Sequence, residues 1–508
     1  MSFHLGRKLM LSWAAMATGL LSGMALYRLQ LAALGPARLG IYVAISAACA
    51  YLALLELGLS AALNRHVAAA DLSKAGADSG FHSLLATALR LYLGIAALAL
   101  LAGAALSGAL QPLLRVPPEL RAETRALPVI LALDVAVALL GGALRGIING
   151  RGHSEVTSTI TLLRHLCYSA LCVFMLRRGV GLQGLSFGLL GCDLLAGVAL
   201  WLALPSAGVA PLSALRARPR RVHLRTLGAF SIVATLAYGG QLLLRQAALP
   251  LVARALGPAA VVGYAAAGRL ALVFFMLMTH TGSVLTPLLA AALARGQLAP
   301  GAALATAGRL GLCVGAPPLV ALLALAEPLL GGWLGPAFQD HAPVLHLMGL
   351  GLLAQLIGLG GDVNHYASGG HLGYALLKLG AGVAAVVAVL GGVGLYGAQG
   401  AALANALVVL LCDAVLTPLF LTHALAAGTL TGYYAALLRR GAALFALLPL
   451  ALLLKKLGPA CTSLTLTLPL AGAAAIVGWA VLFARYLTPD ERALILGRAL
   501  PAAPGGAV

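Results

Sequence analysis

Two long apolar stretches of this sequence carry polar and cationic side chains at helical spacing. Within residues 227–251, one stripe covering roughly a third of a helix circumference holds Ser231, Thr235, Tyr238, Gln241 and Arg245. Within residues 260–289, one face holds Arg269, Met276, His280 and Ser283. Two further apolar stretches contain Arg28 and Lys378. Ionisable side chains inside such stretches usually face a water-filled cavity and mark a substrate path.

The candidate substrate-binding set is cationic apart from one carboxylate, and it consists of Arg28, Glu56, Arg245, Arg269, His280 and Lys378. A cavity lined by fixed positive charge suits an anion, and the planar fork of arginine matches phosphate oxygens in pairs. A phosphate or diphosphate is therefore the favoured ligand. Because an anion that is held too tightly could not leave, we expect Glu56 to tune the affinity.

A structural alternative stays open for each of these cations, and for Arg164, which also lies in an apolar stretch. Each could simply form an ion pair with an acid in the same stretches, of which there are six: Glu56, Asp134, Asp193, Glu327, Asp362 and Asp413.

No other group of residues indicates catalysis or a metal site. The cysteines include no CxxC pair, no metal-ligand spacing occurs, and no Walker motif is present. Glu119 and Glu123 form an i, i+4 pair beside three arginines, and a solvated helical turn explains them better than acid–base catalysis. We therefore expect no enzyme activity, no cofactor and no metal. Coupling to protons or sodium stays unassigned.

The composition identifies the solvent of the chain as a lipid bilayer. Of its 508 residues, 61% are hydrophobic and 9% are charged, and the mean hydropathy is +0.99. Such a chain has too few polar groups to cover a surface that faces water. The net charge of +19 does not indicate nucleic acid, because no basic domain stands free of the apolar stretches. Basic loops beside membrane helices set topology and meet anionic lipid headgroups.

The apolar stretches predict fourteen transmembrane helices: residues 11–34, 40–63, 84–106, 126–148, 159–176, 185–204, 227–251, 260–289, 304–330, 343–359, 374–391, 400–421, 441–454 and 464–483. The loop at 206–226 contains five arginines and no acidic residue, so the positive-inside rule makes it cytoplasmic. Counting six spans back places the N-terminus in the cytoplasm, in agreement with Arg7 and Lys8. The C-terminus is cytoplasmic by the same count, and residues 107–125 form the longest loop on the opposite side.

Short motifs recur in the same order in the two halves of the chain. Residues 33–37, Ala-Leu-Gly-Pro-Ala, recur at 255–259, and each copy is followed by a tyrosine at the same spacing, Tyr42 or Tyr264. Residues 150–153 resemble 368–371, and Gly-Val-Gly-Leu at 179–182 recurs at 392–395. The offsets drift only from 222 to 218 to 213 residues, which indicates an internal duplication.

These features predict an all-α polytopic membrane protein with two parallel lobes. An even number of spans separates the copies, so both point the same way, and their pseudo-two-fold axis follows the membrane normal. We expect a six-helix N-terminal lobe in residues 1–215, a six-helix lobe in residues 216–438 and an additional helix pair with a cytoplasmic tail in residues 439–508. Two such lobes would enclose a central cavity, and their rocking would alternate its opening.

The chain resembles the Wzx-type polysaccharide and O-antigen flippases, a branch of the multidrug/oligosaccharidyl-lipid/polysaccharide (MOP) exporter superfamily. The resemblance covers nearly the whole length. It rests on Leu34-Gly35-Pro36 with Gly40-Ile41-Tyr42, on Glu56-Leu57-Gly58-Leu59 running into Asn64-Arg65, and on the turn and helix at 391–406. The family pattern usually has aspartate at the position of Glu56, a difference that keeps the carboxylate.

The resemblance implies a MATE-like fold and a transport function. Members of this branch move an undecaprenyl-diphosphate-linked oligosaccharide from the inner to the outer leaflet of the bacterial inner membrane, for O-antigen, lipopolysaccharide or other polysaccharide biosynthesis. It implies membrane lipids, a polymerase and other polysaccharide assembly proteins as partners, and no nucleic acid. The runner-up is a cation-coupled multidrug exporter of the same superfamily, which would need a net acidic cavity. A membrane glycosyltransferase, ligase or polymerase is disfavoured because every outer loop is short.

Overall fold

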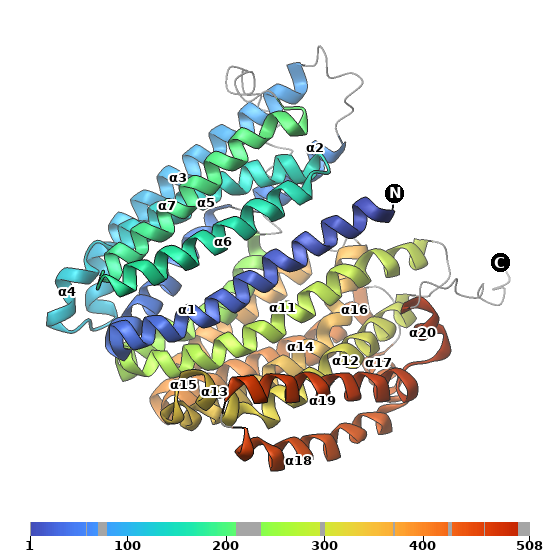
Figure 1. Cartoon of the computed structure of the whole chain (residues 1–508). Helices are drawn as coiled ribbons and strands as arrows, with labels where there is room; N and C mark the ends of the chain where they lie inside the picture. The colour runs from blue at the N-terminus through green and yellow to red at the C-terminus, as the bar shows by residue number, and fades with distance from the viewer. Residues whose placement is uncertain are drawn as a thin grey trace. The chain divides into compact units, whose positions relative to one another are not determined.

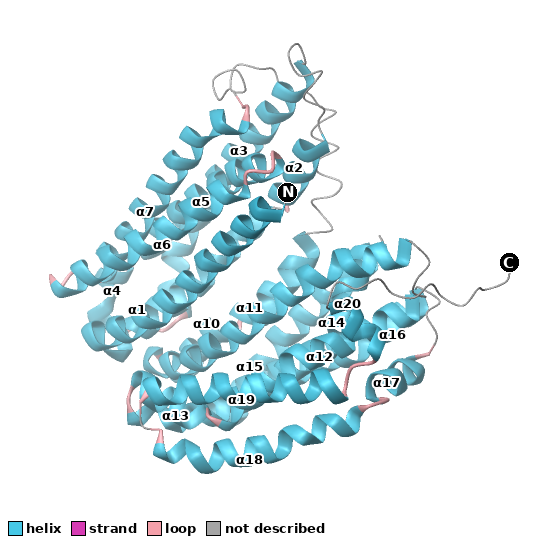
Figure 2. Ribbon diagram, turned by 45° about the vertical axis from the view of Figure 1, so that its right-hand side comes forward, coloured by secondary structure: helices cyan, strands magenta, loops and turns pink. Residues whose placement is uncertain are grey.

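The computed structural model describes residues 2–56, 58–69, 79–209, 235–294, 300–368, 371–424, 429–461 and 463–495. The described residues contain helices and connecting loops and no strand (Figure 2). In a bilayer this is the expected solution, because a helix satisfies all of its backbone hydrogen bonds within one segment. The contacts divide the chain into two units, residues 1–242 with 249–262 (unit 1) and residues 243–248 with 263–508 (unit 2).

Eleven segments of the described chain are long and apolar enough to cross a membrane, so the protein is a multi-pass membrane protein. Two of these segments, Met10–Glu56 and Leu372–His423, each contain two of the predicted spans. The predicted span 227–251 lies partly outside the described residues. The count of fourteen therefore stays a prediction, as does the division of the chain into two six-helix lobes and a tail.

Unit 1 is built around helix α5, Leu127–Gly150, which packs against α1, α2, α3 and α7 (Figure 1). The other elements of this unit are α1 (Ser2–Ala50), η1 (Tyr51–Glu56), α2 (Leu59–Ala69), α3 (Ser79–Leu113), α4 (Pro118–Thr124), α6 (Ser154–Arg177), α7 (Leu182–Ala203), η2 (Leu204–Ala207) and most of α10 (Ala248–Leu256). Helix α6 lies between α1 and α7 and contacts both. Four helices thus surround the middle of α5, which becomes the most enclosed span of this unit.

The predicted outer loop at 107–125 is largely helical. Helix α3 continues to Leu113 because residues 107–113 keep its alanine- and leucine-rich pattern, and α4 follows within the same stretch. On α4, Glu123 forms an ion pair with Arg38 at 3.2 Å and accepts a hydrogen bond from the backbone N–H of Leu182 at 2.9 Å. Glu123 therefore ties three connections together at this end of unit 1.

The duplicated Leu-Gly-Pro motif adopts the same turn in both copies. Gly35 and Gly257 have φ angles of 76° and 88°, a region that L side chains rarely adopt, and a proline follows each. Within unit 1 the second turn approaches Gly40 so closely that a Cβ atom there would lie 1.8 Å from the carbonyl oxygen of Pro258. The recurring sequence therefore specifies a recurring backbone conformation, and this glycine permits a close contact between helices.

Unit 2 is centred on α12, Pro300–Ala324, which packs against α14, α17, α18 and α19. Its elements are α11 (Pro258–Ala294) from Gly263 onward, α12, α13 (Ala326–Leu334), η3 (Pro336–His341), α14 (Ala342–Ser368), α15 (His371–Val409), η4 (Leu410–Leu416), α16 (Thr417–Ala424), α17 (Leu430–Leu438), η5 (Gly441–Ala446), α18 (Leu447–Leu457), η6 (Gly458–Ala460), α19 (Leu464–Arg485) and α20 (Pro489–Ile495). Helix α15 has a break at Gly397, where φ is 58°, so it contains more than one span.

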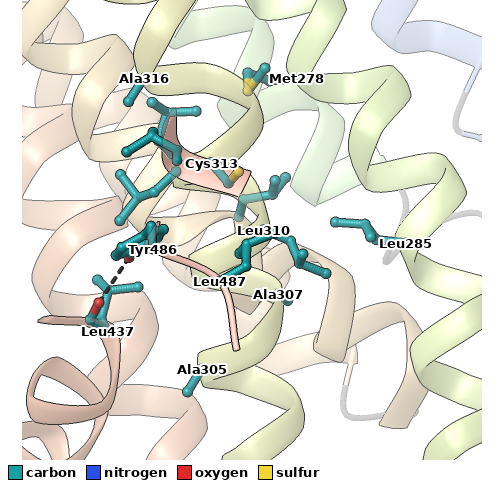
Figure 3. Close-up of a cluster of buried hydrophobic side chains, with 14 of the residues drawn as sticks. Met278, Leu285, Ala305, Ala307, Leu310, Cys313, Ala316, Leu437, Tyr486 and Leu487 are labelled. Atoms are coloured by element: carbon teal, nitrogen blue, oxygen red, sulfur yellow. Dashed lines mark hydrogen bonds between the residues drawn. The ribbon is translucent and has the colours of Figure 1, made fainter. Parts of the chain in front are cut away.

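The end of the chain is packed into unit 2. Tyr486 and Leu487 are fully buried in its main hydrophobic cluster, and the hydroxyl of Tyr486 donates to the carbonyl oxygen of Leu437 at 2.8 Å (Figure 3). Glu491 on α20 pairs with Arg309 on α12, with Nη2 and Oε1 2.6 Å apart. This contact fixes the short C-terminal helix to the first turns of α12.

Candidate functional site

Three helices of unit 1 bring charged side chains together inside the membrane-spanning region. Arg164 on α6 grips Asp193 on α7 with two hydrogen bonds, one from Nε to Oδ1 and one from Nη2 to Oδ2 at 2.6 Å. The two side chains are 24% and 11% exposed. A bidentate guanidinium–carboxylate pair is among the strong polar contacts of proteins. The pair therefore fixes α6 against α7 and leaves part of the guanidinium accessible.

A cavity of about 320 Å³ opens beside this pair, between α5, α6 and α7. Its polar side chains are those of Arg145, Arg164, Asp193 and Thr161, and the rest of its wall is formed by Val137, Ala138, Gly141, Ile160, Ala196, Gly197 and Leu200. Two arginines therefore face one cavity together with a single carboxylate. This combination suits a ligand that carries negative charge.

The predicted residue Glu56 lies close to this cluster. It ends η1, and its Oε1 accepts a hydrogen bond from the hydroxyl of Tyr92 on α3 at 3.0 Å. A Cβ atom at Gly142 would lie 3.2 Å from the same oxygen, so Glu56 packs against α5 one turn before Arg145. Further along the same helix, Oδ1 of Asp134 is buried and has no hydrogen-bond partner among the described residues.

Unit 2 holds a second ion pair, which is more deeply buried than the first. Lys378 on α15 lies 2.5 Å from Oδ1 of Asp413, and the two side chains are 4% and 8% exposed. The ammonium group also lies 5.0 Å from the centre of the Tyr374 ring. Asp413 belongs to a π-helical segment, Leu410–Leu416, a distortion that is frequent at functional sites. Lys378 thus has a carboxylate partner, and its role as a substrate contact stays a prediction.

The remaining predicted residues lie on three helices. In unit 2, Arg245 belongs to a helix at residues 235–246, with its guanidinium 4.4 Å from the centre of the Phe275 ring on α11. Arg269 and His280 lie half-buried on α11 itself. In unit 1, Arg28 is exposed on α1. Unit 2 therefore places Arg245 against the helix that carries two other predicted residues, and the binding roles of all these residues remain predictions.

Arg145 is the cavity residue that sequence reasoning missed. It lies five residues before the end of α5, where a basic residue reads as a flank of the span. A signal was nevertheless present, because Asp134, Gly141 and Arg145 follow one another at spacings of seven and four residues and so share one helical stripe. Arg164 and Asp193 were recognised only as possible partners in ion pairs, which the structure shows them to be with each other.

No protein-family model matches this sequence, and no curated protein matches it either. Solved structures do. The chain is similar to an inward-facing multidrug resistance MATE family transporter of the MOP superfamily, with a TM-score of 0.66 and 16% identity over 82% of this chain and 98% of that one. It is also similar to the lipid II flippase MurJ in an inward closed conformation, with a TM-score of 0.68 and 11% identity over 94% of this chain and 100% of that one.

A third similar structure is a MOP superfamily transporter from Pyrococcus furiosus, described as having a binding pocket of reverse polarity that suggests a different function. Its TM-score is 0.58 and its identity 16%, over 83% of this chain and 95% of that one. At these identities the similarity shows the fold alone. The expected fold class, an all-α membrane protein with the MATE-like MOP architecture, is confirmed.

Proposed function

We propose that this protein is a flippase of the Wzx type. It moves an undecaprenyl-diphosphate-linked oligosaccharide, the repeat unit of an O-antigen or another polysaccharide, from the inner to the outer leaflet of the bacterial inner membrane. The observation that carries this proposal is the presence of cationic side chains within apolar helices of both units: Arg28, Arg145 and Arg164 in unit 1, and Arg245, Arg269 and Lys378 in unit 2. Cations are retained at such depth when a substrate or partner compensates their charge.

The mechanism follows from the charge of the headgroup. A diphosphate cannot enter hydrocarbon without its water unless other groups replace that water, and the guanidinium groups of Arg28, Arg245 and Arg269 can do so in pairs with its oxygens. The prenyl chain stays in lipid, between helices, while the headgroup crosses by alternating access. Carboxylates such as Glu56 weaken the attraction enough for the headgroup to leave.

The comparisons support a lipid-linked substrate over a soluble one. The lipid II flippase matches 94% of this chain, whereas the multidrug transporter matches 82%. The larger coverage leaves room for the C-terminal helices to belong to the shared architecture. Because the MATE transporters also match, a multidrug exporter is the competing function, and it predicts organic cations as substrates.

Reconstitution tests the proposal directly. The purified protein would be placed in proteoliposomes with a fluorescent polyprenyl-diphosphate-linked oligosaccharide, and the exposure of its sugar to an external lectin would be followed with time. We expect exposure to depend on the protein and to be lost when Arg245 and Arg269 are both replaced by alanine. Absence of lipid movement together with efflux of a cationic dye would instead establish the multidrug function.

A further inference from the structure

Arg145 presents an unusual charge to the cavity of unit 1. Its Nη2 donates a hydrogen bond to the carbonyl oxygen of Ala138 at 3.2 Å, and it forms no ion pair with a carboxylate in the part of the chain that the structure describes. Glu56, one turn away, accepts the hydroxyl of Tyr92. A guanidinium inside a membrane protein is expensive unless a negative charge lies near it. The cavity beside Arg145 is where such a charge can be accommodated.

The duplication supplies a comparison within the same chain. Arg164 lies 18 residues before Leu182, and Lys378 lies 17 residues before Leu395, which is the equivalent position in the repeated Gly-Val-Gly-Leu turn. Each cation pairs with an aspartate beyond that turn, Asp193 or Asp413. In unit 2 the pair is almost completely buried, at 4% and 8% exposure. In unit 1 the pair lines a cavity, and its arginine is 24% exposed.

We propose that the cavity between α5, α6 and α7 is a binding site for a phosphate-bearing anion. Arg145 and Arg164 are its ligands, and Asp193 is a competing internal anion that shares Arg164 with the incoming group. The cavity, at about 320 Å³, equals the volume of about ten water molecules at about 30 Å³ each, which is room for a diphosphate. The identification of this anion with a substrate headgroup rests on the proposed function.

Asp193 gives the site its reversibility. When the cavity is empty, the carboxylate neutralises Arg164 and holds α6 against α7. When a phosphate oxygen approaches, Arg164 can keep one N–H on Asp193 and turn its remaining donors to the ligand, while Arg145 supplies the uncompensated charge. The sealed pair in unit 2 leaves no such space, so the two copies of the duplicated pair have diverged in use.

The test is calorimetric titration of the purified full-length protein with inorganic pyrophosphate, repeated with a polyprenyl diphosphate in nanodiscs. Arg145→Gln and Arg164→Gln should each weaken binding about tenfold, the effect of losing one charge-assisted hydrogen bond. Asp193→Asn should strengthen binding about tenfold, because it removes the competing charge. Arg309→Gln and Glu491→Gln are the matched controls, since they disturb a buried ion pair on α12 and α20 and should leave the affinity unchanged.

A merely structural pair between Arg164 and Asp193 predicts a different pattern. Asp193→Asn would then lower the unfolding temperature without tightening pyrophosphate, and Arg145→Gln would bind like the wild type. That result, in variants that elute as folded protein, would overturn the site. If Arg164→Gln fails to fold, Arg145→Gln and Asp193→Asn still decide the question.

The two probes separate this site from the proposed function. Binding of both inorganic pyrophosphate and polyprenyl diphosphate supports the site and identifies the headgroup as its ligand. Binding of pyrophosphate alone supports the site with a soluble phosphate as its ligand. In proteoliposomes, variant-sensitive binding without movement of lipid-linked oligosaccharide would retain the site and reject the flippase.

Discussion

Arg245 lies with its guanidinium over the ring of Phe275, a contact that holds the side chain in place while leaving its N–H donors at the rim available. If Arg245 and Arg269 meet the diphosphate, Arg→Ala at either position should abolish polysaccharide export while the protein still inserts. Arg→Lys should restore export only in part, because lysine keeps the charge and loses the two-pronged contact. The measurement is complementation of export together with membrane abundance for each variant.

A structural role for these arginines would give the opposite pattern in the same experiment. Arg→Ala would lower the amount of folded protein, and Arg→Lys would largely restore it. Normal export by both alanine variants at normal abundance would show that these residues are not the anion site.

The buried pair of Lys378 and Asp413 permits a second prediction at the residue scale. Removing either partner leaves an uncompensated charge in a site that is 4% to 8% exposed, and we expect Asp413→Leu alone to destabilise the fold by about 3–5 kcal/mol. The double variant Lys378→Met with Asp413→Leu should recover most of that loss. Thermal unfolding in detergent measures the stability. Normal export by the double variant would remove Lys378 from the predicted substrate-binding set.

The residue scale is also where sequence reasoning reached its limit. Membrane-embedded cations could be found from the sequence, because a charge inside an apolar stretch is conspicuous. Their partners could not, since Arg164 and Asp193 are 29 positions apart and meet only when α6 and α7 pack together. Arg145 was missed for a related reason: its distance from the helix end is ambiguous until the cavity beside it is known.

At the scale of elements, the close contact at Gly40 provides a test of the packing in unit 1. A Cβ atom on Gly40 would lie 1.8 Å from the carbonyl oxygen of Pro258, so Gly40→Ala must move one backbone segment away from the other. We expect a loss of about 1–3 kcal/mol or more, as for overpacking in a protein core. The matched control is Gly94→Ala on α3, where a Cβ atom would meet nothing within 4 Å. Equal unfolding temperatures for the two variants would contradict this packing.

Helical elements were largely predictable because an apolar stretch in a bilayer can satisfy its backbone only as a helix. The turns at Gly35 and Gly257 were predictable as well, since glycine and proline in this order stop a helix and start the next. The π-helical segment at 410–416 was not. Its residues read as ordinary helix formers, and the distortion depends on packing around Asp413 that no local pattern encodes.

At the scale of the whole molecule, contacts at the helix ends within each unit agree with the predicted sidedness. In unit 1, Lys8 pairs with Glu155 at 3.5 Å, so the N-terminus and the turn after α5 share one side. At the other end, Arg38 pairs with Glu123, so the first turn and α4 share the opposite side. In unit 2, Arg440 donates to the carbonyl oxygen of Leu487 at 2.6 Å, which places the start of the tail pair and the end of α19 together.

These groupings sharpen the last prediction, which concerns topology. The arginine-rich loop at 206–226 lies outside the described residues, yet by the positive-inside rule it fixes one side as cytoplasmic. Reporter fusions at Arg220 and Arg440 should therefore behave as cytoplasmic, and fusions at Glu119 and Gly394 as periplasmic. A fusion at Gly152 must agree with the N-terminus because of the Lys8–Glu155 contact. An external signal at Arg220 would invert the orientation, and the direction of transport proposed for the diphosphate would then have to be reversed with it.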